Sequence, residues 1–371
     1  MNARVVMTMM VRDEADIIAS TLDHHLTQGF EKIIVTDNGS VDGTREILEE
    51  YASQGAVDLR DDPVHRKQQT TVVTQMARDA KTVYDADWVV NADADEIWVA
   101  KNRGITVAQA LSMTPKSIGA FLVPVVDMTG FAAESGMSFS RLRYRDLRPL
   151  PELWRVGLHA HSTPDAVHVG DSEITVWQGN HAVSIANAGD PPAHAGLEVL
   201  HFPWRSWKQY RTKVENAGRA YEANPDMTPS PNHHGMRDWR RLQSGTLFAW
   251  YLARHPSPEE LDKGLALGWF VEEELSWLSS GSSPIDVPIS ENDATAASRA
   301  LVAEAVAAGS NLTTDVSTLQ RDLAQAREDA RELGEALRAL ENAEMYARAE
   351  LDRVRDRKIV RLVDTLSGRR H

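Results

Sequence analysis

An acidic segment follows a short apolar run near the end of the first quarter of the chain. Residues 88–90 are Trp-Val-Val, and residues 91–96 read Asn-Ala-Asp-Ala-Asp-Glu. The carboxylates of Asp93 and Asp95, two positions apart, can face one hard cation where a strand opens into a loop. Mg²⁺ and Mn²⁺ prefer such oxygen ligands and leave coordination sites for substrate phosphates. The pattern predicts a metal site that holds a diphosphate, with a solvated acidic turn as the alternative.

The elements around this segment predict a sheet that places it at a ligand-binding edge. Apolar runs at 5–11, 32–36, 57–60 and 88–91 are typical of strands, and helical patterns separate them at 15–28, 42–53 and 67–84. Strands that alternate with helices form parallel βαβ units, and such sheets bind ligands at the carboxyl ends of their strands. We therefore predict an α/β fold with a doubly wound, mainly parallel sheet and helices on both faces.

The composition excludes several classes of protein. The chain has 371 residues and no cysteine, which excludes disulfides, thiolate nucleophiles and cysteine zinc sites. Lys and Arg number 40 against 54 Asp and Glu, and the net charge of −14 disfavours a nucleic-acid partner. No apolar run approaches the length of a membrane span, and the first residues lack the pattern of a leader peptide. We expect a cytoplasmic protein.

Three segments, in this order, resemble the family 2 glycosyltransferases with the GT-A fold. They are Val-Arg-Asp-Glu-Ala-Asp at 11–16, Asp-Asn-Gly-Ser-Val-Asp-Gly-Thr at 37–44 and Asp-Ala-Asp-Glu at 93–96. Gly-Asn-His at 179–181 and His-Phe-Pro-Trp-Arg-Ser at 201–206, with Lys213, look like the branch whose acidic motif ends in Glu. The resemblance covers residues 4 to 255. It departs from the commoner pattern at Arg12 and Asp13, where Tyr-Asn or a similar pair is usual.

The resemblance implies the transfer of a sugar from a nucleotide-sugar donor, expected to be UDP-linked, to an acceptor hydroxyl with inversion. Asp37 would accept a hydrogen bond from the nucleotide base, because a carboxylate can read an imide N–H. The backbone at Met10 and the side chains of Arg12 and Glu14 would line the nucleotide pocket. Arg66 is a candidate for binding the phosphates, with a solvated helix start as the alternative.

The resemblance also implies the metal ligands. Asp93 would face the ribose and the metal, and Asp95 would bind the Mn²⁺ or Mg²⁺ ion that neutralises the leaving diphosphate. His201, after the apolar run 197–200, would be a third ligand, with a structural histidine as the alternative. Arg205 and Lys213 are further phosphate candidates, or belong to a solvated helix face.

Inverting transfer needs a general base for the acceptor hydroxyl. We favour Asp171, in the sequence Gly-Asp-Ser before a predicted strand, over Glu173 and Glu152. His181 would touch the acceptor or the diphosphate. The acceptor itself, whether carbohydrate, lipid-linked or protein, is left open, because fold does not fix function.

The chain divides into three parts on this interpretation. Residues 1–125 are the nucleotide-sugar-binding half, and residues 126–290 are the acceptor-side half, with strands expected near 119–126 and 174–178 and helices near 206–224, 237–254 and 258–278. Residues 294–371 are an extension. From Leu312 to Val354, core positions recur at alternating spacings of four and three, with Glu344 as the one polar exception. This heptad predicts a C-terminal coiled-coil helix.

The coiled coil predicts a homo-oligomer, while folding back on the enzyme or pairing with another protein are the alternatives. The basic end, 353–370, would suit peripheral contact with an anionic inner membrane surface, and a solvated charged end is the alternative.

Two other functions stay open. A nucleotidyltransferase should carry a Gly-rich phosphate loop after the first strand, and residues 11–14 contain no glycine. A non-catalytic nucleotide-binding scaffold would have the coiled coil as its function.

Overall fold

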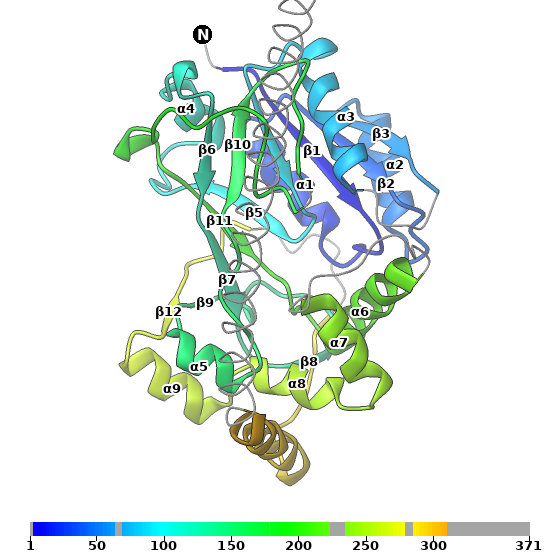
Figure 1. Cartoon of the computed structure of the whole chain (residues 1–371), viewed down its shortest axis with the longest axis vertical. Helices are drawn as coiled ribbons and strands as arrows, with labels where there is room; N and C mark the ends of the chain where they lie inside the picture. The colour runs from blue at the N-terminus through cyan, green and yellow to red at the C-terminus, as the bar shows by residue number, and fades with distance from the viewer. Residues whose placement is uncertain (1–2, 64–68, 178, 223–233, 279–284, 310–371) are drawn as a thin grey trace, which may run out of the picture. The chain divides into compact units, whose positions relative to one another are not determined.

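The computed structural model describes residues 3–63, 69–177, 179–222, 234–278 and 285–309 (Figure 1). The chain separates into two compact units, Met1–Val306 and Ala307–His371. The predicted coiled coil, the basic end and Arg66 lie outside the described residues. Every strand of the described chain belongs to the first unit.

A six-stranded sheet forms the upper half of this unit in Figure 1. Its order is β3 (Val57–Asp61), β2 (Lys32–Asp37), β1 (Val5–Val11), β4 (Trp88–Ala92), β10 (Asp165–Val169) and β6 (Ala120–Val123). The first four strands are parallel, whereas β10 runs antiparallel to both of its neighbours. The four predicted strands and their parallel arrangement are confirmed.

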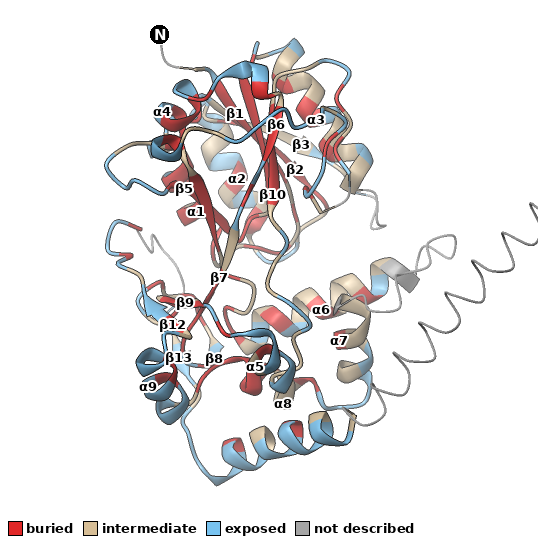
Figure 2. Cartoon of the chain, turned by 60° about the vertical axis from the view of Figure 1, so that its left-hand side comes forward, coloured by how far each residue is buried: buried red, intermediate tan, exposed pale blue. Residues whose placement is uncertain are grey.

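Helices cover both faces of this sheet because its strands are apolar on both sides. Val5, Met7 and Met9 of β1 pack in one core cluster with α1 (Ile18–Thr27), α2 (Thr44–Ser53) and α4 (Val107–Ser112). Val6 packs in a second cluster with α3 (Gln69–Thr82) on the opposite face. Figure 2 shows the strands as the buried layer between these helices. Period-two alternation in a strand with two covered faces gives this pattern.

A second sheet continues from the acidic segment. Its order is β12 (Phe270–Glu272), β9 (Tyr144–Asp146), β7 (Val125–Thr129), β11 (Leu197–His201) and β5 (Glu96–Ala100). β5 begins four residues after β4 ends, and antiparallel β11 places His201 opposite Glu96. A short pair, β8 (Ala133–Ser135) and β13 (Val287–Pro288), lies below.

Helices gather around the lower part of the unit (Figure 1). They are α5 (Leu150–Arg155), α6 (Trp207–Glu222), α7 (His234–Gln243), α8 (Leu247–Arg254) and α9 (Pro258–Ala266). Two short 3₁₀ turns, η1 (Lys116–Ile118) and η2 (Ala193–Ala195), instead add Ile118 and Ala195 to the core of the six-stranded sheet. Residues 293–309 are also helical. No helix in the described ranges is long and apolar enough to cross a membrane.

Four predicted elements differ from those observed. The strand expected near 119–126 is divided at Pro124 into β6 and β7, which belong to different sheets. The strand expected at 174–178 is reduced to an isolated bridge between Val176 and Val183. The helix expected at 237–254 is broken at Gly245, whose φ of 75° is left-handed. The helix expected at 258–278 ends at Ala266, and Gly268, with φ 70°, turns the chain into β12. Both breaks use glycine because it adopts positive φ without a steric penalty.

Candidate active site

The acidic segment lies between two buried strands. β4 ends at Ala92 and β5 begins at Glu96, so Asp93 and Asp95 sit in the connecting turn at the carboxyl edge of the parallel sheet. Asp95 is only 1% exposed. A carboxylate buried to this degree needs compensating charges or hydrogen bonds, because desolvation disfavours its ionised form.

Three cationic side chains compensate Asp95. Its Oδ2 forms an ion pair with the Lys213 ammonium group and lies 3.4 Å from Arg205 Nη1 and 3.7 Å from His201 Nε2. Burial alone would raise the pKa of Asp95, but Lys213 and His201 outweigh it and hold that pKa well below its usual range. Asp95 is therefore a carboxylate at neutral pH.

His201 is held in one orientation by Asp127. Its Nδ1 lies 2.8 Å from Asp127 Oδ1, which also accepts a hydrogen bond from Ser162 Oγ at 2.7 Å. Burial would lower the pKa of His201, but Asp95 and Asp127 outweigh it and raise that pKa well above 6.5. Because Asp127 binds Nδ1, the other ring nitrogen, Nε2, faces Asp95.

This pair fits a divalent cation that displaces the proton on Nε2, because a histidine binds a metal through an unprotonated ring nitrogen. A carboxylate or carbonyl behind the distal nitrogen is the usual support of a metal-binding histidine. Two atoms each about 2.1 Å from one ion lie roughly 3 to 4 Å apart, and Nε2 of His201 and Oδ2 of Asp95 are 3.7 Å apart. Among the described residues, no three His, Asp or Glu side chains converge as a complete ligand set.

Asp93 is held differently from Asp95. Its Oδ1 accepts long hydrogen bonds, both 3.3 Å, from the amides of Gln69 and Asn180. Its backbone N–H donates to Glu96 Oε2 at 2.9 Å. Burial, followed by repulsion from Asp95, raises the pKa of Asp93 to about 6. The two amides thus fix the orientation of the Asp93 carboxylate, which was expected to face the ribose and the metal.

Arg205 differs from its expected role. The residue is 0% exposed and forms ion pairs with Glu14 and, at 2.9 Å, with Asp16. It therefore cannot be a solvated helix residue, and no surface of it is free for a phosphate. Its guanidinium also occupies Glu14, which was expected to line the nucleotide pocket. Burial raises the pKa of Glu14 to about 7 although Arg205 opposes the shift.

The expected nucleotide-binding residues lie at the carboxyl ends of β1 and β2 and, for Arg12 and Glu14, in the segment that follows β1. Val11 is in register with Asp37, and Met10 with Thr36. Asp37 Oδ1 accepts hydrogen bonds from the backbone N–H and the hydroxyl of Ser40, at 3.0 and 2.6 Å, so half of its carboxylate shapes the loop. Arg12 donates to the carbonyl of Asn38.

Helix α6 connects these loops to the acidic turn. Lys213 pairs with Asp95, and Asn216, one turn further along, donates to Asp13 Oδ2 at 2.6 Å. Asp13 has φ 56°, a left-handed conformation, and its other oxygen accepts the N–H of Val41 at 2.8 Å. Strained conformations of this kind are typical of functional loops.

The structure does not bring Asp171 to the site, which corrects its assignment as general base. Antiparallel β10 pairs Val169 with Trp88, at the start of β4, so Asp171 follows at the opposite edge of the sheet. Its Oδ1 accepts the N–H of Glu173 at 2.7 Å, as in an ordinary turn. His181, in contrast, lies next to Asn180, which contacts Asp93.

Several residues of the site escaped the sequence interpretation. Asp127 follows the first residues of an apolar strand, and Asp165 stands directly before an apolar run. That signal was present, but many surface turns share it. Gln69, Ser162 and Asn216 carry no signal in the sequence, since their roles depend on which elements become neighbours in space.

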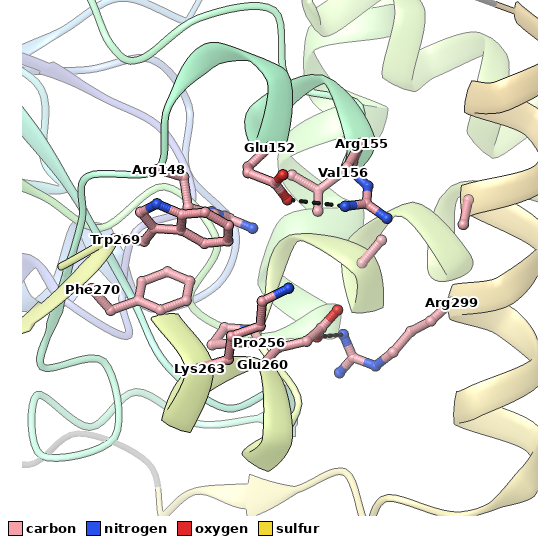
Figure 3. A pocket seen from close by; sticks show the side chains of 12 residues that line it. Arg148, Glu152, Arg155, Val156, Pro256, Glu260, Lys263, Trp269, Phe270 and Arg299 are labelled. Carbon is pink, nitrogen blue, oxygen red and sulfur yellow. Dashed lines mark hydrogen bonds and ion pairs between the residues drawn. The ribbon is translucent and has the colours of Figure 1, made fainter. Parts of the chain in front are cut away.

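A separate cavity of about 200 Å³ lies in the lower part of the unit, between α5, α8, α9 and β12. Figure 3 shows Trp269 and Phe270 on one side of it and the Glu152–Arg155 pair on another. Arg148 is held by Asp146 at 2.6 Å, and Lys263 lies over the Trp269 ring. None of the acidic-turn residues lines this cavity.

Residues 5–141 match the family model of glycosyltransferase family 92. The matched range is less than half of the chain and contains β1 to β4 and the acidic turn. The match supports the expected enzyme class, a glycosyltransferase, whereas the resemblance to family 2 in particular stays a prediction. No curated protein matches the chain.

Solved structures with a similar fold are distant. S. aureus TarS, residues 1–349, is 12% identical over 71% of this chain and 74% of that chain, with a TM-score of 0.33. Its complex with UDP-GlcNAc gives 13% identity over 71% of this chain and 75% of that chain, with a TM-score of 0.34. The 4-diphosphocytidyl-2C-methyl-D-erythritol synthase is 12% identical over 37% of this chain and 67% of that chain, with a TM-score of 0.24.

Proposed function

We propose that the protein transfers a sugar from a nucleotide-sugar donor, UDP-linked, to an acceptor hydroxyl with the help of a divalent cation. The observation that carries the proposal is the orientation of His201, whose Nδ1 is held by Asp127 while Nε2 faces Asp95 across 3.7 Å. Asp95 and His201 are the residues that would hold Mn²⁺ or Mg²⁺. When bound, such an ion neutralises the negative charge of the leaving diphosphate.

The side chains around this pair have separate tasks in the proposal. Lys213, already against Asp95, is placed to contact a diphosphate oxygen as a point charge. Oδ2 of Asp37, which lies 3.8 Å from Arg45 Nη1, is the acceptor for the base, because Ser40 occupies Oδ1. Asp93 accepts a hydrogen bond from the ribose, taking the place that Gln69 and Asn180 fill at 3.3 Å.

Calorimetric titration with UDP, with Mn²⁺ and with EDTA, tests the proposal. Wild type should bind UDP more tightly with Mn²⁺, and Asp95→Asn should lose that gain, because its amide is a poor metal ligand. Asp85→Asn is the matched control, since this carboxylate is exposed and pairs only with surface cations in the described structure. Equal UDP affinity in Mn²⁺ and in EDTA would refute the metal dependence, and no affinity for UDP under either condition would refute the donor.

Assembly and location form a separate part of the proposal. The heptad from Leu312 to Val354 would join copies of the chain, and its basic end would bring the enzyme to an anionic membrane surface in the cytoplasm. A carbohydrate, lipid-linked or protein acceptor is compatible with this arrangement. Sedimentation of the full chain tests the first point, because a monomer at micromolar concentration would contradict self-association.

A further inference from the structure

The segment 179–181 has a backbone that few sequences can adopt. Gly179 has φ 82° and Asn180 has φ 61°. The N–H of Asn180 donates to the carbonyl of Trp177 at 3.2 Å, and its carbonyl accepts from Ala166 of β10 at 2.9 Å. A Cβ at Gly179 would lie 2.9 Å from both Cδ2 and Nε2 of His181. Glycine is therefore required twice, for its φ and for the space that the imidazole occupies.

This backbone holds His181 against a buried carboxylate. His181 Nδ1 lies 2.9 Å from Asp165 Oδ1. Asp165 is 0% exposed, and among the described residues none donates a hydrogen bond to its Oδ2. Because a carboxylate only accepts, Nδ1 carries the proton and the lone pair is on Nε2. The His181 side chain is 44% exposed, and no described residue occupies Nε2.

The pair lies at the acidic turn. In β10, Val167 pairs with Val90 of β4, so Asp165, two residues earlier, reaches the carboxyl end of β4. Asn180 joins the same place from the other side by donating to Asp93 Oδ1 at 3.3 Å. The His181 imidazole, whose Nε2 has no partner among the described residues, thus lies near Asp93, the carboxylate expected to face the donor.

We propose that His181 is the general base of the transfer and that Asp165 is its positioning residue. This assignment rests on the proposed glycosyl transfer. The acceptor O–H gives its proton to Nε2 of His181 while the acceptor oxygen forms a bond to the anomeric carbon. The bond from that carbon to the diphosphate oxygen breaks, and its electron pair leaves with the nucleoside diphosphate. Attack opposite to the leaving group inverts the anomeric centre, and the imidazolium then loses its proton to water.

The charges around His181 favour this task. The hydrogen bond to Asp165, opposed by burial and aided by the charge of Asp93, raises the pKa of His181 above 6.5. Glu96 also faces Asp165, and its own pKa is well above the usual range because of burial and the charges of Asp165 and Asp93. An imidazole supported in this way is a stronger base, and activity should fall as the pH drops below its pKa.

Two variants and a control test the assignment. The first readout is the affinity of each protein for UDP in the presence of Mn²⁺. The second is the rate at which each protein releases UDP from UDP-glucose, UDP-galactose or UDP-GlcNAc when glycoside acceptors are present. His181→Gln should lower kcat by about 100-fold or more, the usual contribution of a general base, and leave UDP affinity within about twofold. His159→Gln, at an exposed position of the same half, should retain wild-type kcat.

Asp165→Asn should lower kcat and move the acid limb of the pH profile to lower pH, which a purely structural role would not do. Nitrogen NMR of the His181 ring should show the Nδ1–H tautomer in wild type and a lower pKa in this variant. If Asp165→Asn does not fold, His181→Gln and the NMR spectrum of wild type decide the matter.

The failures are distinguishable. Wild type that neither binds nor releases UDP would refute the proposed function. A kcat of His181→Gln above one tenth of the wild-type value would overturn the assignment of His181 as the base and leave the proposed function intact. A wild-type His181 ring that carries its proton on Nε2 would do the same.

Discussion

Replacing Arg205 by methionine should lower the free energy of unfolding by more than the loss of an exposed, phosphate-binding arginine would. The fully buried guanidinium pairs with Glu14, with Asp16 at 2.9 Å and with Asp95 at 3.4 Å. Methionine fills much of the same volume but removes the cation that these three carboxylates share. Removing one partner from a buried ion pair costs about 3–5 kcal/mol.

The loss should appear in both denaturation and pH dependence. At about 2 °C per kcal/mol for a unit of this size, Tm should fall by roughly 6–10 °C. Glu14 has a pKa raised to about 7 by burial, with Arg205 opposing the rise, so the variant should raise it further. A raised carboxyl pKa means stability that is lost as the pH rises toward the folded pKa. Wild type levels off above pH 7 while the variant continues to lose stability, so the gap between them widens from pH 6 to pH 9.

Urea denaturation at these two pH values provides the measurement. Arg211→Met is the matched control, because Arg211 is exposed and pairs only with Glu215 one turn away in the described structure; its loss should cost less than about 1 kcal/mol. A change below about 1 kcal/mol for Arg205→Met, together with weakened UDP binding, would refute the structural role and restore the phosphate-binding one.

Three further outcomes are expected. Lys213→Met should weaken UDP binding about tenfold or more by calorimetry, whereas Lys208→Met, on the exposed face of α6, should not. Burial lowers the pKa of His168 to about 4, so this residue alone should contribute a fall of up to about 3 kcal/mol in unfolding free energy as the pH drops from 6.5 to 4. His168→Gln should remove that share of the pH dependence and leave the share of the other buried histidines, His24, His25 and His255. Truncation after Gly309 should give a monomer by sedimentation with wild-type turnover; an unchanged oligomer would place the association elsewhere.

The parallel half of the fold was accessible from the sequence because its signals are local. Apolar runs at β1, β2 and β4 alternate with helical patterns. The Asp-Asn-Gly-Ser turn at 37–40 comes directly at the end of β2, and the acidic turn at 93–95 comes directly after β4. Local periodicity and strand order together determine which loops meet at one edge. The positions of Asp37, Asp93 and Asp95 at that edge follow from these rules alone.

The acceptor-side half was less accessible because its arrangement depends on long-range pairing. β10 enters the first sheet antiparallel, which carries Asp171 away from the acidic turn and brings Asp165 to it. No pattern around residue 165 distinguishes these two outcomes. Likewise, the burial of Arg205 results from the approach of the 201–206 segment to the loop after β1, and a basic residue before a helix is usually solvated.

Helix α6 limits how this enzyme can be recombined with others. One stretch of it meets the loops of the nucleotide-binding half through Lys213 and Asn216, while Tyr210 joins the buried network of Asp238 and Arg254 in the lower helices. A chimera cut near residue 125 would transplant the donor loops without the helix that completes them. The smallest exchangeable module for donor preference is therefore discontinuous, made of residues 1–141, 165–181 and 197–222, and directed evolution of donor choice should treat these segments as one library.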